Sequence, residues 1–334
     1  GGSGGENSGD SGGTGGSGDG SDPGSGDDEP GDTGGGNDPP PDHTIVAAGA
    51  TLAASLMSPE QIVAALNAIG DLHRKVTETE QEQNLSALRR VQAYRLLAGL
   101  RTDITIDPSD VLLADAAADI CMQLGTLTHS PSRPAGMSDE QYALAQKGAA
   151  ESNLASRYPI ITIPYSIDLY MDDSDAFNIS QVGHRRWILS PIMRGTGFGL
   201  SSDNRSSAMH VFPDVDLGNA CHASPGALQE WDFLLYPRWG YMPTNYFAGA
   251  HVAWTITLRG DRYNAAGVTA ADITVNPVDA DNNPTGAALN IAYFNRSTTH
   301  YGCQSPVLIF RPQGVQVTVG SRYRVSVTGI TDGS

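Results

Sequence analysis

The sequence has few cysteines, few basic residues, few aromatic residues and no long apolar run. Its 334 residues include 3 cysteines, none at C-x-x-C spacing, which argues against a zinc ribbon and a disulfide-dense fold. No apolar run reaches the roughly 18 residues that a membrane-spanning helix requires. Lys and Arg number 20 against 37 Asp and Glu, a net charge of −17. Nucleic acid is therefore not expected as a partner, because it requires a basic surface.

The acidic excess is concentrated at the start of the chain. Residues 1–43 contain 10 acidic residues, 17 glycines and no Lys, Arg, Phe, Trp or Tyr. Such a segment cannot bury enough apolar area to offset its ordering entropy, which predicts a disordered acidic Gly/Ser/Asp linker. Its composition resembles the stalk of bacterial surface lipoproteins. This resemblance implies a secreted or cell-surface protein, a possible lipoprotein, with peripheral attachment to the cell envelope.

Helix signals dominate the middle of the chain, and strand signals follow. Ser58 and Ser138 each begin a capping box, and a proline follows Asp107 at a first helical position. The expected helices cover residues 59–76, 83–99, 108–125, 139–153 and 165–172. The expected strands cover residues 197–200, 208–212 and 251–258, and residues 314–319 and 322–327 are expected to form a hairpin. The fold class is therefore α+β, ending in a small all-β sandwich.

Three segments follow from this pattern. Residues 1–43 form the linker, residues 44–220 a helix-rich α+β domain, and residues 221–334 a β-sandwich domain. Whether residues 44–82 belong to the domain or form an N-terminal helical extension stays open. Cys121 has an apolar, helical context typical of a buried thiol. Cys221 and Cys303 could pair, and the sequence does not decide it.

Four short motifs occur in an order that resembles a known superfamily. They are Arg89–Leu100, the Leu-Thr-His-Ser run 127–130, Ser-Asn-Leu-Ala at 152–155 and Gly-His-Arg-Arg at 183–186. Over residues 84–212 they resemble the CAP superfamily of cysteine-rich secretory, antigen 5 and pathogenesis-related-1 proteins, in its bacterial SCP-like branch. The resemblance implies a CAP-like α-β-α sandwich, followed here by an Ig-like β-sandwich.

The resemblance also implies a central cleft where two histidines and two acids can hold a divalent metal such as zinc. His129 and His184 match the two histidines, and Asp173 matches the second acid. Ser152 stands where the family has its first acid. Glu151 lies one position earlier, which on a helix rotates it by about 100° and points it away from the cleft. The metal ligands that remain are His129, His184 and Asp173, which would leave a zinc site open or weak.

The arginines after His184 favour two opposing interpretations. A positive charge beside His184 would oppose a bound cation and depress the pKa of the histidine. Alternatively, one arginine forks onto Asp172 or Asp173 and fixes the preceding helix. The stretch 181–191 itself is either one wall of a site or a surface loop entering a strand.

The predicted function is an extracellular or cell-surface CAP-domain protein that acts as a non-catalytic binding module. The cleft and ligand-binding residues are expected to be His129, Ser130, Glu151, Ser152, Asn153, Asp173, His184 and Arg185. The ligand is left open among a lipid, a peptide, a glycan and a surface protein. No P-loop, G-x-S-x-G, H-E-x-x-H or dinucleotide motif is present, so no catalytic residue is assigned. The alternative is a metal-dependent or Ser/His hydrolase acting on envelope or peptide substrates, so enzymatic activity stays uncertain.

Overall fold

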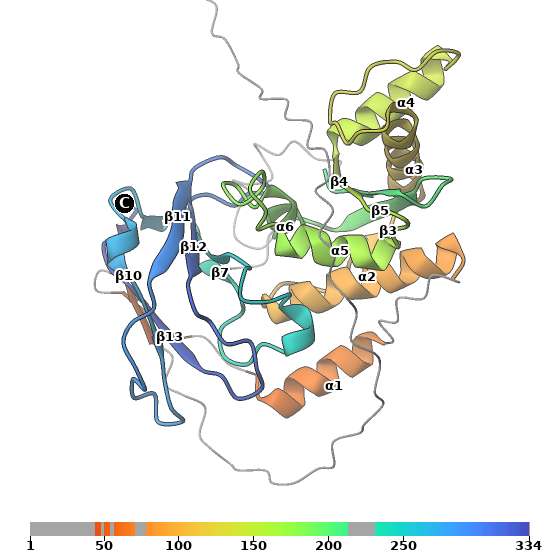
Figure 1. The fold of residues 1–334 in the computed structure, drawn as a ribbon. Helices are drawn as coiled ribbons and strands as arrows, with labels where there is room; N and C mark the ends of the chain where they lie inside the picture. The colour runs from red at the N-terminus through yellow and green to blue at the C-terminus, as the bar shows by residue number, and fades with distance from the viewer. Residues whose placement is uncertain (1–43, 48–49, 54–56, 71–77, 213–230, 334) are drawn as a thin grey trace, which may run out of the picture.

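The computed structural model describes residues 44–47, 50–53, 57–70, 78–212 and 231–333. The predicted linker 1–43 and Cys221 lie outside the described residues. Both helices and sheets are present, which confirms the α+β class (Figure 1). The helices are α1 Pro59–Ile69, α2 Glu80–Leu97, α3 Pro108–Leu124, α4 Asp139–Ala150, α5 Ile163–Asp172 and α6 Gly183–Ile188, with short 3-10 turns η1 Thr244–Tyr246 and η2 Ala270–Asp272.

The strands fall into two groups along the chain. In the first half they are β1 Thr44–Ala47, β2 Ala50–Ala53, β3 Thr105–Ile106, β4 Ser152–Ser156, β5 Gly195–Leu200 and β6 Ser206–His210. In the second half they are β7 Phe233–Tyr236, β8 Trp254–Leu258, β9 Tyr263–Asn264, β10 Ile273–Pro277, β11 Ile291–Ser297, β12 Val307–Pro312, β13 Tyr323–Val327 and β14 Thr331–Asp332.

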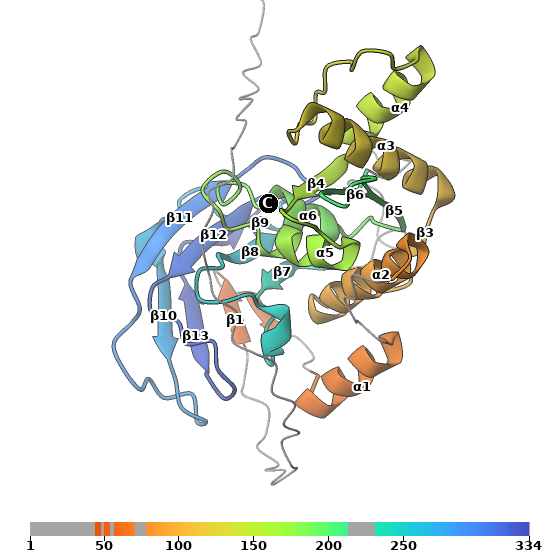
Figure 2. The same cartoon turned by 45° about the vertical axis from the view of Figure 1, so that its right-hand side comes forward.

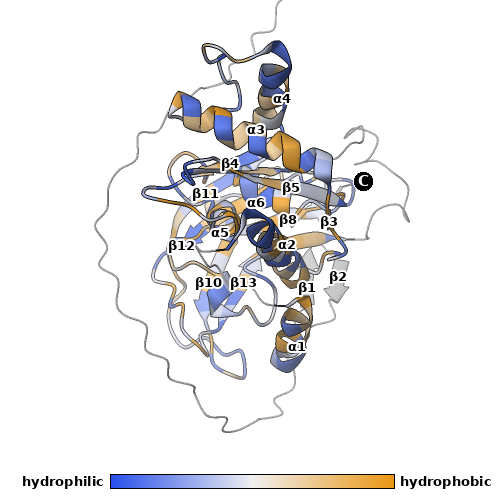
Figure 3. Cartoon of the chain, turned by 90° about the vertical axis from the view of Figure 1, so that its right-hand side faces the viewer, coloured by the Kyte–Doolittle hydropathy of each residue, from blue (hydrophilic) through white to orange (hydrophobic). Residues whose placement is uncertain are grey.

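A four-stranded sheet in the order β3-β5-β6-β4 lies at the centre of the first half. Helices α3 and α4 cover one of its faces, and α2 and α5 lie on the other (Figure 3). Two glycines of β5 let α3 approach closely. A Cβ on Gly197 would lie 2.1 Å from the Asp110 carbonyl carbon, and one on Gly199 would lie 2.3 Å from that of Ala114. The glycines therefore place α3 directly on the sheet.

The predicted helix starts at Pro59, Pro108 and Asp139 are confirmed, whereas other predicted bounds are wrong. Ser58 and Ser138 make their capping boxes, and Asp107 caps α3. Helix α4 ends at Ala150 instead of reaching residue 153, because the chain turns there into β4. Helix α2 begins after Thr79, whose own capping box with Glu82 was overlooked.

The second half contains a four-stranded sheet, β11-β12-β8-β7, and two pairs, β10-β13 and β14-β9. Trp254 of the larger sheet packs edge-on against Tyr323 of β13, with ring centroids 5.9 Å apart. The predicted hairpin is wrong, because β13 pairs with β10 rather than with residues 314–319. The amide of Gln316 instead donates to the Tyr323 hydroxyl at 2.6 Å, so a side chain takes the place of a strand partner.

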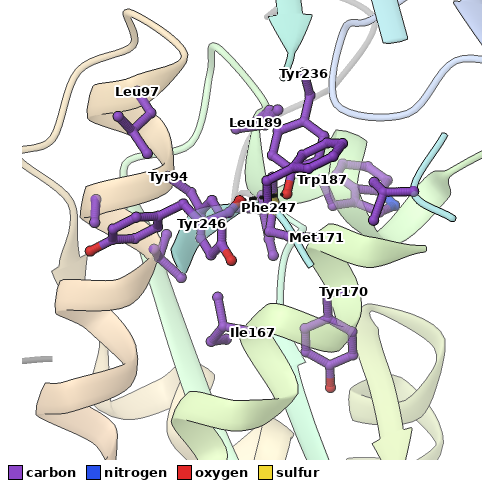
Figure 4. Packing of buried hydrophobic residues seen from close by; sticks show 14 of the residues in the cluster. Tyr94, Leu97, Ile167, Tyr170, Met171, Trp187, Leu189, Tyr236, Tyr246 and Phe247 are labelled. Carbon is purple, nitrogen blue, oxygen red and sulfur yellow. Dashed lines mark hydrogen bonds between the residues drawn. The ribbon is translucent and has the colours of Figure 1, made fainter. Parts of the chain in front are cut away.

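One hydrophobic cluster runs through both halves of the described chain, which lie side by side in Figure 2. It contains Ile167 and Trp187 from the first half and Tyr236, Tyr246 and Phe310 from the second. Figure 4 shows its aromatic centre, where α2, α5 and α6 meet the segment after β7. Because the two halves share this core, residues near their contact are held by both.

Candidate functional site

His184 is paired with Asp173 across the loop that joins α5 to α6. The Nδ1 atom of His184 lies 2.8 Å from Oδ1 of Asp173, and the other carboxylate oxygen accepts the Arg185 amide at 3.3 Å. The His184 side chain is 20 % exposed, whereas that of Asp173 is 1 % exposed. The pair therefore presents one edge of an imidazole to solvent while its carboxylate is enclosed.

Two residues of this loop have left-handed backbone conformations. Asp173 caps the C-terminus of α5 with φ 46°, and Val182 precedes α6 with φ 43°. An aspartate tolerates this region, but a β-branched valine there is a genuine outlier. Backbone strain of this kind gathers at functional sites, where surrounding packing over-determines it. Val182 is fully buried, so packing holds the strained turn in front of His184.

The environment of His184 favours its charged form. Burial opposes the charge, but the Asp173 carboxylate more than offsets this and the pKa of His184 is raised. The arginine neighbours were expected to depress this pKa, and that expectation is wrong because the carboxylate dominates. Tyr170 packs beneath the imidazole with ring centroids 5.5 Å apart. Its hydroxyl donates to the carbonyl of Asn153 at 3.0 Å, which fixes the ring.

His129 lies at the surface, in the turn after α3. Its Nδ1 atom is 2.7 Å from the carbonyl oxygen of Ala149, so the imidazole donates from Nδ1 to the last turn of α4. Although the residue is exposed, the chain packed around the ring lowers the pKa of His129, and the charge of His184 lowers it further. The two predicted histidines are therefore near enough for the charge of His184 to act on His129, and the shifts favour the neutral form of His129 and the charged form of His184.

The first residues of β4 follow α4, whose Ala149 holds His129, and one of them contacts His184. The Asn153 side chain donates to the carbonyl oxygen of His184 at 3.0 Å. Ser152 is 3 % exposed, and its hydroxyl has no hydrogen-bond partner in the described part of the chain. Ser130 is exposed, and its amide donates to the Thr128 hydroxyl at 3.1 Å. Asn153 therefore fixes the backbone at His184, whereas the Ser152 hydroxyl has no hydrogen-bond partner among the described residues.

The two arginines after His184 point away from solvent and towards the second half of the chain. Each is 1 % exposed. Arg185 donates to the carbonyl of Ala253 at 2.8 Å and to that of Met171 at 2.8 Å. Its guanidinium donates to the backbone carbonyl of Asp172 and forks onto no carboxylate of the described residues, so the predicted pair with Asp172 or Asp173 is not formed. Arg185 is therefore part of the contact between the halves rather than a ligand-facing residue.

Arg186 makes the same kind of contact with the loop before β12. It donates to the carbonyls of Thr299 and Gln304 and lies 4.9 Å from the centre of the Tyr301 ring. The stretch from Gly183 forms helix α6, and the expectation of a loop entering a strand is wrong. A Cβ on Gly183 would meet Tyr301 at 3.1 Å, so the glycine allows this close contact.

A third histidine, which the sequence interpretation overlooked, lies next to this site. His210 ends β6 and is 2 % exposed. Its Nε2 is 3.2 Å from a carboxylate oxygen of Glu151, and its Nδ1 is 3.1 Å from Asp110. The Asp110 contact is an ion pair, because its oxygen lies off the N–H direction. Glu151 therefore faces His210 instead of His184. His210 lies 59 positions from Glu151 and still farther from Asp110, so no local spacing identifies the group.

The residues present do not fit a zinc centre. Within the described ranges, no three His, Cys, Asp or Glu side chains converge as a metal-binding group. Asp173 bonds to Nδ1 of His184 and so orients the imidazole rather than adding a ligand beside it. A cavity of about 280 Å³ lies elsewhere, near the start of α2, and residues such as Glu78, Gln83 and Ser201 line it. A cleft between His129 and His184 therefore stays a prediction.

Cysteine chemistry is separate from the site. Cys121 is a free, buried thiol on α3, as its apolar context predicted. Cys303 is disulfide-bonded, while Cys221, which the sequence offers as its partner, lies outside the described residues. No helix among the described residues combines the length and apolarity needed to cross a bilayer.

Comparison with known proteins gives no relative: no family model, no curated protein and no solved structure matches the chain.

Proposed function

We propose that the chain is an extracellular or cell-surface binding module with a CAP-like domain and a following Ig-like sandwich. Its ligand is bound at His129 and His184. The order of the four motifs and the helices on both faces of the first sheet support the CAP-like assignment. The acidic composition of residues 1–43 supports the location. The pairing of Asp173 with His184 at 2.8 Å is the observation that carries the proposal.

This pair gives the ligand a charge preference. With Nδ1 directed at Asp173, the Nε2 atom of a charged His184 is left to donate to a ligand. The neutral His129 likewise has Nδ1 occupied by Ala149 and its Nε2 left over. An imidazolium beside a neutral imidazole suits an acidic oxygen, because a charge-assisted hydrogen bond to it is shorter and stronger than a neutral one. The proposed ligand therefore presents a carboxylate or phosphate group, whether on a lipid, a peptide, an acidic glycan or a surface protein.

Histidine-labelled protein titrated with inorganic phosphate and with acetate tests this proposal. The imidazole resonances of His129 and His184 should shift together with one dissociation constant. The shifts should disappear in His184→Ala. His251→Ala is the matched control, since His251 also pairs with an aspartate at 2.8 Å but its side chain is 58 % exposed. The proposed site would be rejected if the resonances of His129 and His184 did not respond to either anion. It would also be rejected if the His184→Ala and His251→Ala variants lost the shifts equally.

A hydrolase that uses the same residues is the second candidate. A histidine oriented by a carboxylate is the usual general base for activating a hydroxyl or water. Ser152 supplies a buried hydroxyl without a partner among the described residues. A panel of ester and peptide substrates distinguishes the two functions. Turnover that His184→Ala abolishes and His251→Ala preserves would support the hydrolase, and no wild-type turnover would leave binding alone.

A further inference from the structure

His210 is enclosed between two helices that flank the candidate site. Its ring lies 3.1 Å from Asp110, in the first turn of α3, and 3.2 Å from Glu151, the C-cap of α4. A neutral imidazole has one N–H and one lone pair, so a ring that donates from Nε2 to Glu151 carries no charge to attract Asp110, whose carboxylate lies 3.1 Å from Nδ1. Only the imidazolium suits both neighbours. A protonated His210 therefore links Asp110 of α3 to Glu151 at the end of α4.

The charged groups around this ring agree with that conclusion. Asp107, the N-cap of α3, also interacts electrostatically with His210. Lys147 of α4 lies 3.9 Å from Glu151 and is the other cation that forms an ion pair with that carboxylate among the described residues. From β4 and β5, the residues opposite His210 are Ser152 and Gly197, and neither carries a charge. Burial opposes the charge on the ring, but Asp110 and Glu151 more than offset it, and the pKa of His210 is raised.

Glu151 connects this ring to both histidines of the site. Ala149, whose carbonyl holds His129 at 2.7 Å, lies two residues before it. Asn153, whose side chain holds the His184 carbonyl at 3.0 Å, lies two residues after it. The Glu151 carbonyl also accepts the Val211 amide at 3.0 Å. A change in the contact between His210 and Glu151 would therefore also affect the hydrogen bonds that hold His129 and His184.

Ser152 offers the neutral ring a second partner. It lies directly opposite His210 in the β4–β6 register, so both side chains are on the same face of the sheet. Its hydroxyl is buried and without a partner among the described residues. After His210 loses its proton, the bare ring nitrogen can accept from this hydroxyl. Ser152 would therefore give the neutral ring a partner of its own, so that each protonation state has a different set of contacts, as a switch requires.

We propose that His210 is a proton-controlled lock on the candidate site: its imidazolium fastens the α4–β4 junction through Glu151 and Asp110, and its neutral form releases that junction. This regulation rests on the proposed function of the His129–His184 site. The folded state holds the proton more tightly than the unfolded chain, whose histidine titrates near 6.5. The stabilisation is complete below that pH and is lost as pH rises through the pKa of folded His210.

Amide hydrogen exchange tests the lock without any ligand. The amides of Glu151 and Val211 report on the junction, because each is bonded across it or at its end. After correction for intrinsic exchange, their protection should fall by up to about tenfold per pH unit between pH 6.5 and the pKa of folded His210, and it should level off at higher pH, where the neutral form dominates. The His129 imidazole resonance should shift with the same midpoint. Because phosphate is absent, failure of the binding proposal leaves this outcome unchanged.

Three variants complete the test. His210→Gln cannot be protonated and should remove the pH step, whereas His251→Gln should keep it. If His210→Gln does not fold, Asp110→Asn serves instead, because loss of one carboxylate should move the midpoint down by about one pH unit. A step that persists in His210→Gln, a midpoint unmoved in Asp110→Asn, or a His129 shift with a different midpoint would overturn the lock.

Discussion

Replacing Asp173 by Asn should lower the pKa of His184 from its raised value to below the ordinary histidine value of 6.5. The substitution keeps size and shape, and asparagine tolerates the left-handed conformation that Asp173 adopts at φ 46°. What is lost is a charge-assisted contact of 2.8 Å. Such a bond is worth about 1.5–3 kcal/mol, or roughly one to two pKa units. Burial, which opposes the imidazolium, remains.

Histidine resonances followed against pH measure this change directly. The same substitution should destabilise the fold more at pH 5 than at pH 8, because the pair stabilises the fold below the unfolded pKa and loses this effect as pH rises through the folded one. Urea unfolding at the two pH values checks the sign. Asp172→Asn is the matched control, since Asp172 pairs with the exposed His251. A His184 pKa that stays raised in Asp173→Asn would refute the role given to the carboxylate.

Three other substitutions test the packing and charge arguments. Gly197→Ala should cost about 2 kcal/mol in chemical unfolding, because its Cβ would meet the backbone of α3, and the reasoning fails if stability is unchanged. Arg186→Met should cost about 3 kcal/mol or more, since it leaves buried carbonyls without donors, and an unchanged melting temperature would contradict this. Burial and the neighbouring Glu80 raise the pKa of Asp115 to about 7, so Asp115→Asn should add about 1 kcal/mol at pH 8, after allowance for partial exposure, and less than half of that at pH 5. Equal effects at both pH values would rule out that carboxylate as the cause.

Helix starts could be predicted because their signals are local. Ser58 and Ser138 bond to backbone groups within three residues, so the sequence alone specifies both partners. The strand pairing of residues 323–327 could not be predicted in this way. Its partner β10 lies some 50 positions earlier, and the alternating pattern of residues 314–319 looked equally suitable. Local pattern identifies a strand, whereas tertiary packing selects its neighbour.

Some residues of the candidate site could likewise be predicted from local motifs, and others could not. His129, Asp173 and His184 were found through short motifs, and the pairing of Asp173 with His184 spans only 11 positions. His210 was missed because the carboxylates that define its chemistry come from two helix ends remote in sequence. A histidine at the end of a strand carries no local signal of such an environment. What identifies it is a pair of distances, which only the fold supplies.

The role of the two arginines beside His184 differs most between the sequence prediction and the structure. As neighbours in sequence, they suggested a repulsive field around the histidine. On helix α6, however, Arg185 and Arg186 are buried, and their charges are directed at carbonyl oxygens of the second half of the chain. Burial lowers the pKa of Arg186 to about 10, which still leaves it charged at neutral pH. The second half therefore holds both cations away from the imidazole, and the Asp173 carboxylate is left to set the charge of His184.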